Sequence, residues 1–145
     1  FQSYLVAGEF NVEKWTQDSH AKRENEGIIH DLNHLQRLTW VDWMNTLSTF
    51  KYAVHLMPTV AAGTFSLNCA YFGIPCIGNE KVDTQRICHP DLSVDVGDVE
   101  KARKLANKLN IDPEFYKECS ENAKNNYNAY YKIDKYKEKL NHQLI

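Results

Sequence analysis

Residues 52–78 read YAVHLMPTVAAGTFSLNCAYFGIPCIG, and this stretch decides the fold class. It opens with an unbroken apolar run, residues 52–57, which is typical of a central parallel strand covered on both faces and which Pro58 ends. Residues 64–72 follow as a short helix, with a glycine just before it and another just after it as a stop signal. Residues 75–78 form the next strand. The stretch therefore predicts a strand–helix–strand unit with parallel strands.

The rest of the chain continues the alternation of strands and helices. We expect a polar turn at residues 22–27 and a loop carrying Arg86 and His89 before the last strand. Asp98 and the Asp112-Pro113 pair are typical starts of the two closing helices. The other expected strands lie at residues 4–8, 34–38 and 92–96, and the other expected helices at residues 11–21, 42–50, 99–109 and 113–131. This order predicts one α/β domain over residues 1–145, a doubly wound parallel sheet with helices on both faces.

Composition excludes several classes of protein. The 145 residues are 43% hydrophobic and 25% charged, which is the profile of one soluble globular domain. A net charge of −2 provides no field that would hold nucleic acid or an acidic membrane, so no nucleic-acid partner is expected. No apolar run reaches the roughly 18 residues of a membrane span, so no transmembrane segment is expected.

The cysteines form no pair with metal-site spacing. Without a C-x-x-C motif, a zinc site is not expected, and free thiols that pack as small hydrophobic groups are the natural interpretation. This usage is typical of a cytoplasmic protein. The four positions are Cys69, Cys76, Cys88 and Cys119.

The turn between the apolar strand and its helix is a candidate anion site. The small residues 61–63 leave room for a ligand close to the backbone, and the N–H groups of Gly63, Thr64, Phe65 and Ser66 point out of the carboxyl end of the sheet. The helix dipole adds partial positive charge, and the hydroxyls of Thr64 and Ser66 can add donors. The pattern predicts a diphosphate site, although the same small residues would also allow strand and helix to pack tightly.

The histidines carry weaker signals. His55 lies inside the expected strand and is interpreted as a core histidine with satisfied hydrogen bonds. His30 and His34 are four residues apart, a spacing that suits a metal only on a helix, and no third ligand accompanies them. No metal site is expected.

The central segment resembles the donor-binding segment of GT-B-fold glycosyltransferases, in the C-terminal lobe of the group 1 family. In that family a strand ends in Pro-Ser, a glycine loop opens a helix, and Gly-x-Pro leads into the next strand. Here Pro58, Gly63 and residues 73–75 follow the same order and spacing. The resemblance implies a Rossmann-like doubly wound sheet that lacks its first strand–helix unit. The chain, which begins at Phe1, would then be a piece of a two-lobe enzyme.

The resemblance also implies a function. Such an enzyme moves a sugar from a nucleoside-diphosphate-sugar donor to an acceptor and generally needs no metal or other cofactor. This chain would supply the donor lobe, while the missing N-terminal lobe would hold the acceptor site, so the fragment should be inactive alone. Implied contacts are Gly63, Thr64, Phe65 and Ser66 for the diphosphate, Asn68 for the ribose, and Leu38, Thr39 and Trp40 for the nucleobase. Arg86 is the local substitute for the family's Arg and Lys, which would precede this chain.

One departure from the family pattern leaves alternatives open. The family's pair of glutamates falls on Val60 and Asn68; an asparagine amide can still bind hydroxyls, whereas valine cannot replace a carboxylate. A nucleotide-sugar epimerase, a receiver-like signalling module and a lobe kept only for protein contacts are the alternative functions. Trp40 as a core residue and Arg86 as an ordinary surface arginine are the alternative roles.

Overall fold

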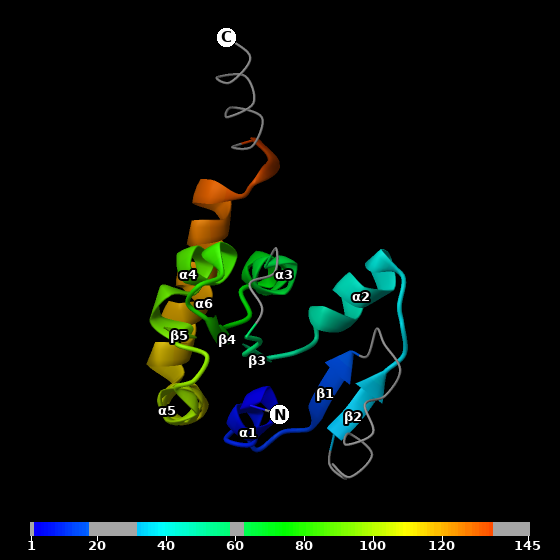
Figure 1. Ribbon diagram of the computed structural model, residues 1–145. Helices are drawn as coiled ribbons and strands as arrows, with labels where there is room; N and C mark the ends of the chain where they lie inside the picture. Colours follow the sequence, from blue (N-terminus) through cyan, green and yellow to red (C-terminus); the bar gives the residue numbers. More distant parts are fainter. Residues whose placement is uncertain (1, 18–31, 59–62, 135–145) are drawn as a thin grey trace.

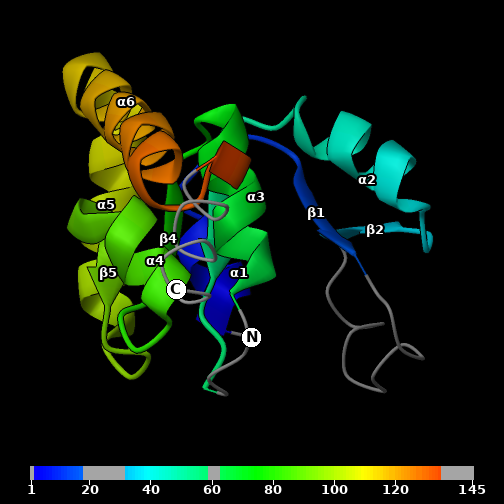
Figure 2. The same ribbon diagram turned by 90° about the horizontal axis from the view of Figure 1, so that it is seen from above.

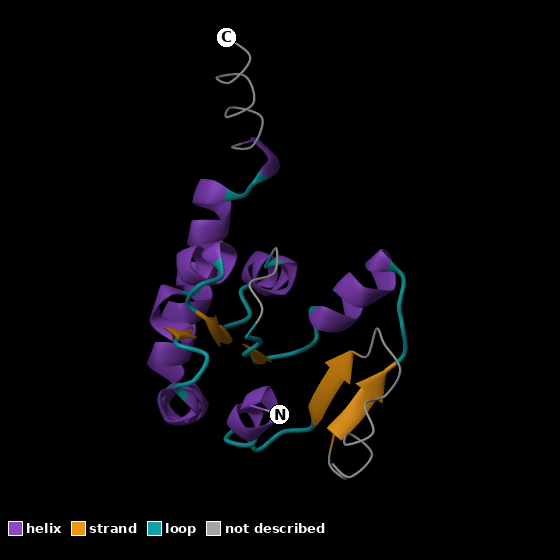
Figure 3. Cartoon of the chain, in the orientation of Figure 1, coloured by secondary structure: helices purple, strands orange, loops and turns teal. Residues whose placement is uncertain are grey.

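The computed structural model describes residues 2–17, 32–58 and 63–134 of the chain. Helices and parallel strands alternate along these residues (Figure 3). The elements are α1 (Gln2–Ala7), β1 (Lys14–Gln17), β2 (Leu32–Leu35), α2 (Trp40–Leu47), β3 (Ala53–His55), α3 (Thr64–Phe72), β4 (Cys76–Asn79), α4 (Asp83–Cys88), the 3-10 helix η2 (Pro90–Leu92), β5 (Ser93–Val94), α5 (Val99–Ile111) and α6 (Pro113–Tyr130).

The described strands form two parallel sheets. One has three strands in the order β3-β4-β5, with Val54 opposite Ile77 and Gly78 opposite Ser93. The other pairs β1 with β2, Lys14 standing opposite Leu32. The chain is therefore a mixed α/β protein with parallel strands, as the alternating pattern predicts.

Helices surround the three-stranded sheet. In Figure 1, α4, α5 and α6 lie on one side of it, and α2 stands with β1 and β2 on the other. Figure 2, turned by 90°, shows the same division. No described helix combines the length and the apolar character that crossing a lipid bilayer requires.

Two main apolar clusters hold these layers together. One joins α1, the sheet, α5 and α6, and its fully buried members include Val6, Ile77 and Leu109. The other joins α2, α3, β3 and β4 around Leu47 and Ile74. All four cysteines are buried free thiols, as the sequence predicts. Cys69 and Cys76 belong to the second cluster.

Four elements form where the sequence predicts them. α3 occupies the expected residues, and its end at Gly73 has a left-handed φ of 69°. α5 begins after Asp98, whose side chain accepts the Lys101 N–H, and α6 begins after Asp112, which accepts two N–H groups in the same way. β4 follows α3 and is buried along its whole length. Capping groups and glycine stops are local signals, which is why the sequence alone located these elements.

Side chains of α6 bind the carboxyl ends of two other helices. The Ser120 hydroxyl donates to the Gly73 carbonyl at 2.6 Å, just beyond α3. The Asn126 amide donates to the Ile87 carbonyl at 2.9 Å, in the last turn of α4. These bonds satisfy carbonyls that a helix end leaves without an intrahelical partner.

The predictions for the first twenty residues are wrong where the structure describes them. Of residues 4–8, expected as a strand, all but Gly8 belong to α1, whose Val6 is buried while Leu5 is exposed. Residues 11–21, expected as a helix, contain β1, because residues 14–17 pair with β2. A short apolar run does not distinguish helix from strand, and partners distant in sequence decide the outcome. The turn expected at residues 22–27 lies outside the described residues.

Other boundaries also differ from the prediction. β2 ends at Leu35, three residues before the expected end, and α2 starts at Trp40, two residues before Asp42, because Thr39 accepts the Asp42 N–H and caps it. β3 is an edge strand of the described sheet, whereas β4 is central. The strand expected at residues 92–96 shortens to β5.

The loop expected around Arg86 and His89 contains a helix, α4. Asp83 in its first turn and Arg86 in its last turn form an ion pair at 2.7 Å, one turn apart along the helix. The apolar content of these six residues is too low for periodicity to reveal a helix, so the sequence suggests a loop.

Candidate functional site

The site predicted at the start of α3 is built around Gly63. Its φ of 76° is left-handed, a conformation that glycine adopts without the steric cost of a side chain. A Cβ on Gly63 would overlap Thr84 Oγ1 and would lie 2.8 Å from Val82 Cγ1. The Thr84 hydroxyl donates to the Gly63 carbonyl at 2.8 Å. The glycine is therefore required for close packing against α4, and this packing also sets the direction in which α3 begins.

The first turn of α3 exposes its backbone unevenly. In the described part of the chain, no acceptor bonds the N–H groups of Thr64, Phe65 and Ser66. Thr64 is exposed, but Ser66 is only 1% exposed and its hydroxyl donates to Gln85 Oε1 at 2.8 Å. The Ser66 hydroxyl is thus not available to a ligand, contrary to the expectation that it adds a donor. The Thr64 hydroxyl remains accessible.

A buried polar network fixes this turn from the sheet side. Gln85 is fully buried; its Nε2 donates to the Cys76 carbonyl at 2.7 Å while its Oε1 accepts from Ser66. His89 is 2% exposed, with Nε2 3.0 Å from the Ser66 carbonyl and Nδ1 accepting the Cys76 N–H at 3.4 Å. Because an amide N–H can only donate, Nδ1 carries no proton and Nε2–H is the donor. The imidazole is neutral, and burial lowers the pKa of His89 to about 4.

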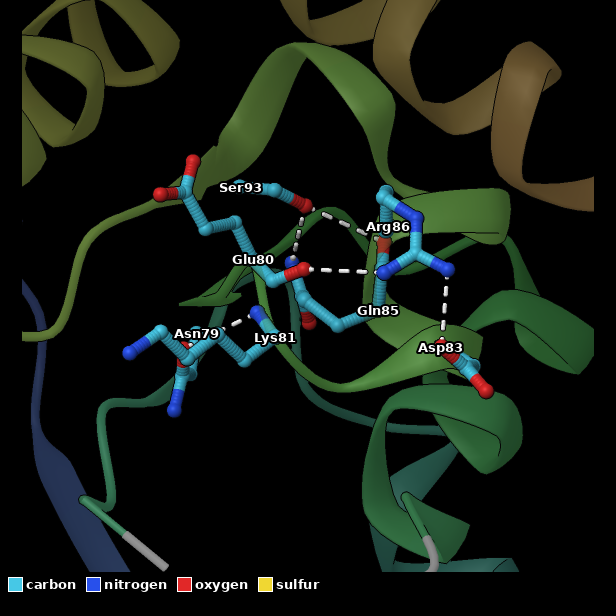
Figure 4. A network of polar contacts seen from close by, with 7 residues as sticks. All are labelled: Asn79, Glu80, Lys81, Asp83, Gln85, Arg86 and Ser93. Carbon is cyan, nitrogen blue, oxygen red and sulfur yellow. Dashed lines mark hydrogen bonds and ion pairs between the residues drawn. The ribbon is translucent and has the colours of Figure 1, made fainter. Parts of the chain in front are cut away.

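Sequence reasoning did not find the structural roles of Gln85 and His89. Figure 4 shows Gln85, in α4, beside Ser93, the first residue of β5. Their spacing of four residues could have indicated these roles, because it places both side chains on one helical face once α4 is known to be a helix.

The opposite side of the same turn has aromatic contacts and a polar side chain without a hydrogen-bond partner among the described residues. The Phe65 ring lies 5.2 Å from the His55 ring and 6.3 Å from the Trp43 ring, between centroids. Asn68 is 8% exposed, and among the described residues its side-chain amide has no hydrogen-bond partner. The polar groups of the first turn of α3 are therefore hydrogen-bonded on the side of the sheet, whereas those on the side of α2 have no partner among the described residues.

The structure separates the remaining predicted residues from this turn. Thr39 caps α2, Leu38 is half-buried and Trp40 is 59% exposed, so Trp40 is not a core residue. It is Trp43 that contacts α3. Arg86 reaches back to the carboxylate of Asp83 and the carbonyl of Glu80, as Figure 4 shows.

No group of three or more His, Cys, Asp or Glu side chains in the described part of the chain is suitably arranged to hold a metal ion. His34 lies in β2, while His30 and Val60 fall outside the described residues.

Comparisons with known proteins identify no relative. No family model, no curated protein and no solved structure matches this chain. The site must therefore be interpreted from its own geometry.

The His89 network predicts a pH-dependent stability. The pKa of His89 is about 4 in the folded chain, below the usual 6.5. Between these two pH values the unfolded chain binds a proton at His89 that the folded chain does not bind. The stabilisation is complete above pH 6.5 and is lost as the pH falls to 4, by about 3 kcal/mol. Urea unfolding at pH 7, 5.5 and 4.5 measures it. His89→Gln, the matched control, should lose less stability over this window; equal losses in both proteins would contradict the assignment.

The packing of Gly63 predicts a strong effect of a single methyl group. Gly63→Ala places Cβ against Thr84 in a left-handed backbone, and should lower the free energy of unfolding by about 2 kcal/mol or more. Gly97→Ala is the control, because Gly97 is exposed and its Cβ would meet only Asp95 Oδ1, at 3.2 Å. Thermal and urea unfolding compare the two variants, and losses of the same size would show that Gly63 is not under this constraint.

Proposed function

We propose that this chain is the donor-binding lobe of a GT-B-type glycosyltransferase and that the start of α3 binds the diphosphate of a nucleotide sugar. The observation that carries the proposal is the first turn of α3. Its N–H groups at residues 64–66, beyond the carboxyl end of the parallel strand β3, have no acceptor in the described chain. A helix start of this kind favours phosphate, because the partial positive charge of the helix and the free donors act together.

The order of elements agrees with the proposed family. β3, α3 and β4 follow one another with Pro58, Gly63 and Pro75 at the junctions, and two closing helices, α5 and α6, end the described chain. In this proposal the three-stranded parallel sheet β3-β4-β5 is the core of a Rossmann-like doubly wound sheet.

The chemistry is transfer of a glycosyl group. The bond between the anomeric carbon of the sugar and the diphosphate oxygen breaks, and the electron pair leaves with the diphosphate. An acceptor hydroxyl forms the new bond and gives its proton to a base. The role of α3 is to stabilise the charge that develops on the leaving diphosphate. The acceptor and the base belong to the N-terminal lobe, so the chain alone should bind the donor without transferring it.

Each proposed contact has a distinct chemical role. The amides of Thr64, Phe65 and Ser66 bind phosphoryl oxygens, and the Asn68 amide binds the ribose hydroxyls. The nucleobase lies against the segment 38–40, where the exposed Trp40 ring can stack. Arg86 is already paired with Asp83, so it contributes to phosphate binding only if that ion pair opens.

A negative charge placed at residue 64 tests the phosphate site without lowering the stability of the fold. Thr64→Asp puts a carboxylate at the start of α3, which stabilises a helix but repels a phosphate. Its affinity for UDP, GDP or ADP should be about tenfold or more below that of Thr64→Asn, the uncharged control. Calorimetry measures the affinities, and NMR locates the site. Equal affinities, or shifts that avoid residues 63–68, would remove the proposal.

A substitution at Asn68 tests the ribose contact separately from the diphosphate contact. Asn68→Leu removes the unpartnered amide while keeping a side chain of similar size, and should weaken nucleotide binding about tenfold. Binding of inorganic diphosphate should change little, because it has no ribose. The ratio of the two affinities, measured by calorimetry, is the readout, and a uniform loss for both ligands would place Asn68 elsewhere.

A further inference from the structure

His55 occupies an unexpected position for a core histidine. It is the last residue of β3, at the carboxyl end of that strand, and its ring packs on Phe65 in the first turn of α3 at 5.2 Å. The side chain is half-buried, and no described residue bonds either ring nitrogen. Contrary to the expectation of satisfied hydrogen bonds, the described residues offer the ring a contact with Phe65 but no hydrogen bond.

A second unpartnered polar group flanks the same turn. Asn68 is more than nine-tenths buried, with 8% exposed, and lies one helical turn after Thr64 on the same face. Side chains on a helix lean toward its N-terminus, which directs the Asn68 amide toward the turn that Phe65 and His55 enclose. The amide has no hydrogen-bond partner among the described residues and is not sealed from solvent, so a ligand with hydrogen-bonding groups can reach it at this place.

The surroundings of His55 are poor in charge. The described elements that pack most closely against β3 are α1, α3 and β4, and none of these three contains Asp, Glu, Lys or Arg. Their titratable groups are Tyr4, Cys69, Tyr71 and Cys76, and the nearest charged residue on α2, which packs on Phe65 through Trp43, is the exposed Asp42. An anion bound beside His55 would therefore act on the imidazole with little competition.

We propose that His55 is a ligand contact of the α3 site, neutral in the free protein and, as an imidazolium, donating a hydrogen bond to a phosphoryl oxygen of the bound diphosphate. This inference rests on the proposed function, since it assigns a side chain to the same phosphate. It supplies a positive charge that Arg86, paired with Asp83, does not offer.

The protonation state of His55 follows from its burial. Desolvation lowers the pKa of His55 in the free protein, so the ring is neutral at pH 7. A bound phosphate favours the charged form and raises that pKa, so binding takes up a proton. Affinity for diphosphate should then be highest at low pH and should fall as the pH rises through the pKa of the bound form.

The test follows the His55 imidazole directly in the full 145-residue chain. NMR titration of the ring from pH 5 to 8, with and without inorganic diphosphate, should show its pKa rising by about one unit or more when the ligand is present. The affinity gained between pH 8 and pH 6 should be about tenfold larger for the wild type than for His55→Gln. Both proteins see the same ligand, so titration of diphosphate itself cancels in this comparison.

The outcomes separate this inference from the proposed function. If diphosphate shifts the amides of residues 64–66 but leaves the His55 titration unchanged, His55 is not a contact and the proposed phosphate site stands. If neither the amides nor the imidazole respond, both proposals fail. The wild-type titration decides the question even if His55→Gln folds poorly.

Discussion

The contact between Gly63 and Thr84 is the constraint on which the rest of the structure depends. The left-handed backbone at Gly63 turns the chain from β3 into α3, and the Thr84 hydroxyl bonds the Gly63 carbonyl at that turn. There is no room for a side chain between them. The start of α3 and the start of α4 are therefore fixed to each other, and the first-turn amides of α3 are positioned by this junction.

The first turn of α3 combines two environments with opposite chemistry. Toward the sheet, Gln85 and His89 satisfy the hydroxyl and the carbonyl of Ser66, so this side is rigid and closed to a ligand. Toward α2, the side chains of His55 and Asn68 have no hydrogen-bond partner among the described residues. Polar groups near a core are normally satisfied, and the contrast within one helical turn is what favours a binding site over simple packing. The small residues of the strand–helix junction serve both purposes, because Gly63 is required by packing as well.

Local signals predicted part of this structure, and contacts distant in sequence determined the rest. Asp98, Asp112 and the glycines around α3 act on their immediate neighbours, so the helices that they delimit were predicted correctly. α1 and β1 were interchanged, because their short apolar segments suit either conformation and pairing with β2 selects one. At the site, the position of Gly63 was predictable. The burial of the Ser66 hydroxyl and the pairing of Arg86 depend on α4, which no local pattern specifies, and the open ring of His55 depends on its packing against Phe65.

The hydrogen bonds from α6 have a mechanical consequence. Ser120 donates to the carbonyl just beyond α3, and Asn126 donates to a carbonyl in α4. Both helices are therefore tethered at their carboxyl ends to the long helix α6. Their near ends meet at Gly63 and Thr84. A force that tilted α6 would therefore carry both helices together and move the first-turn amides of α3 as a unit with the start of α4.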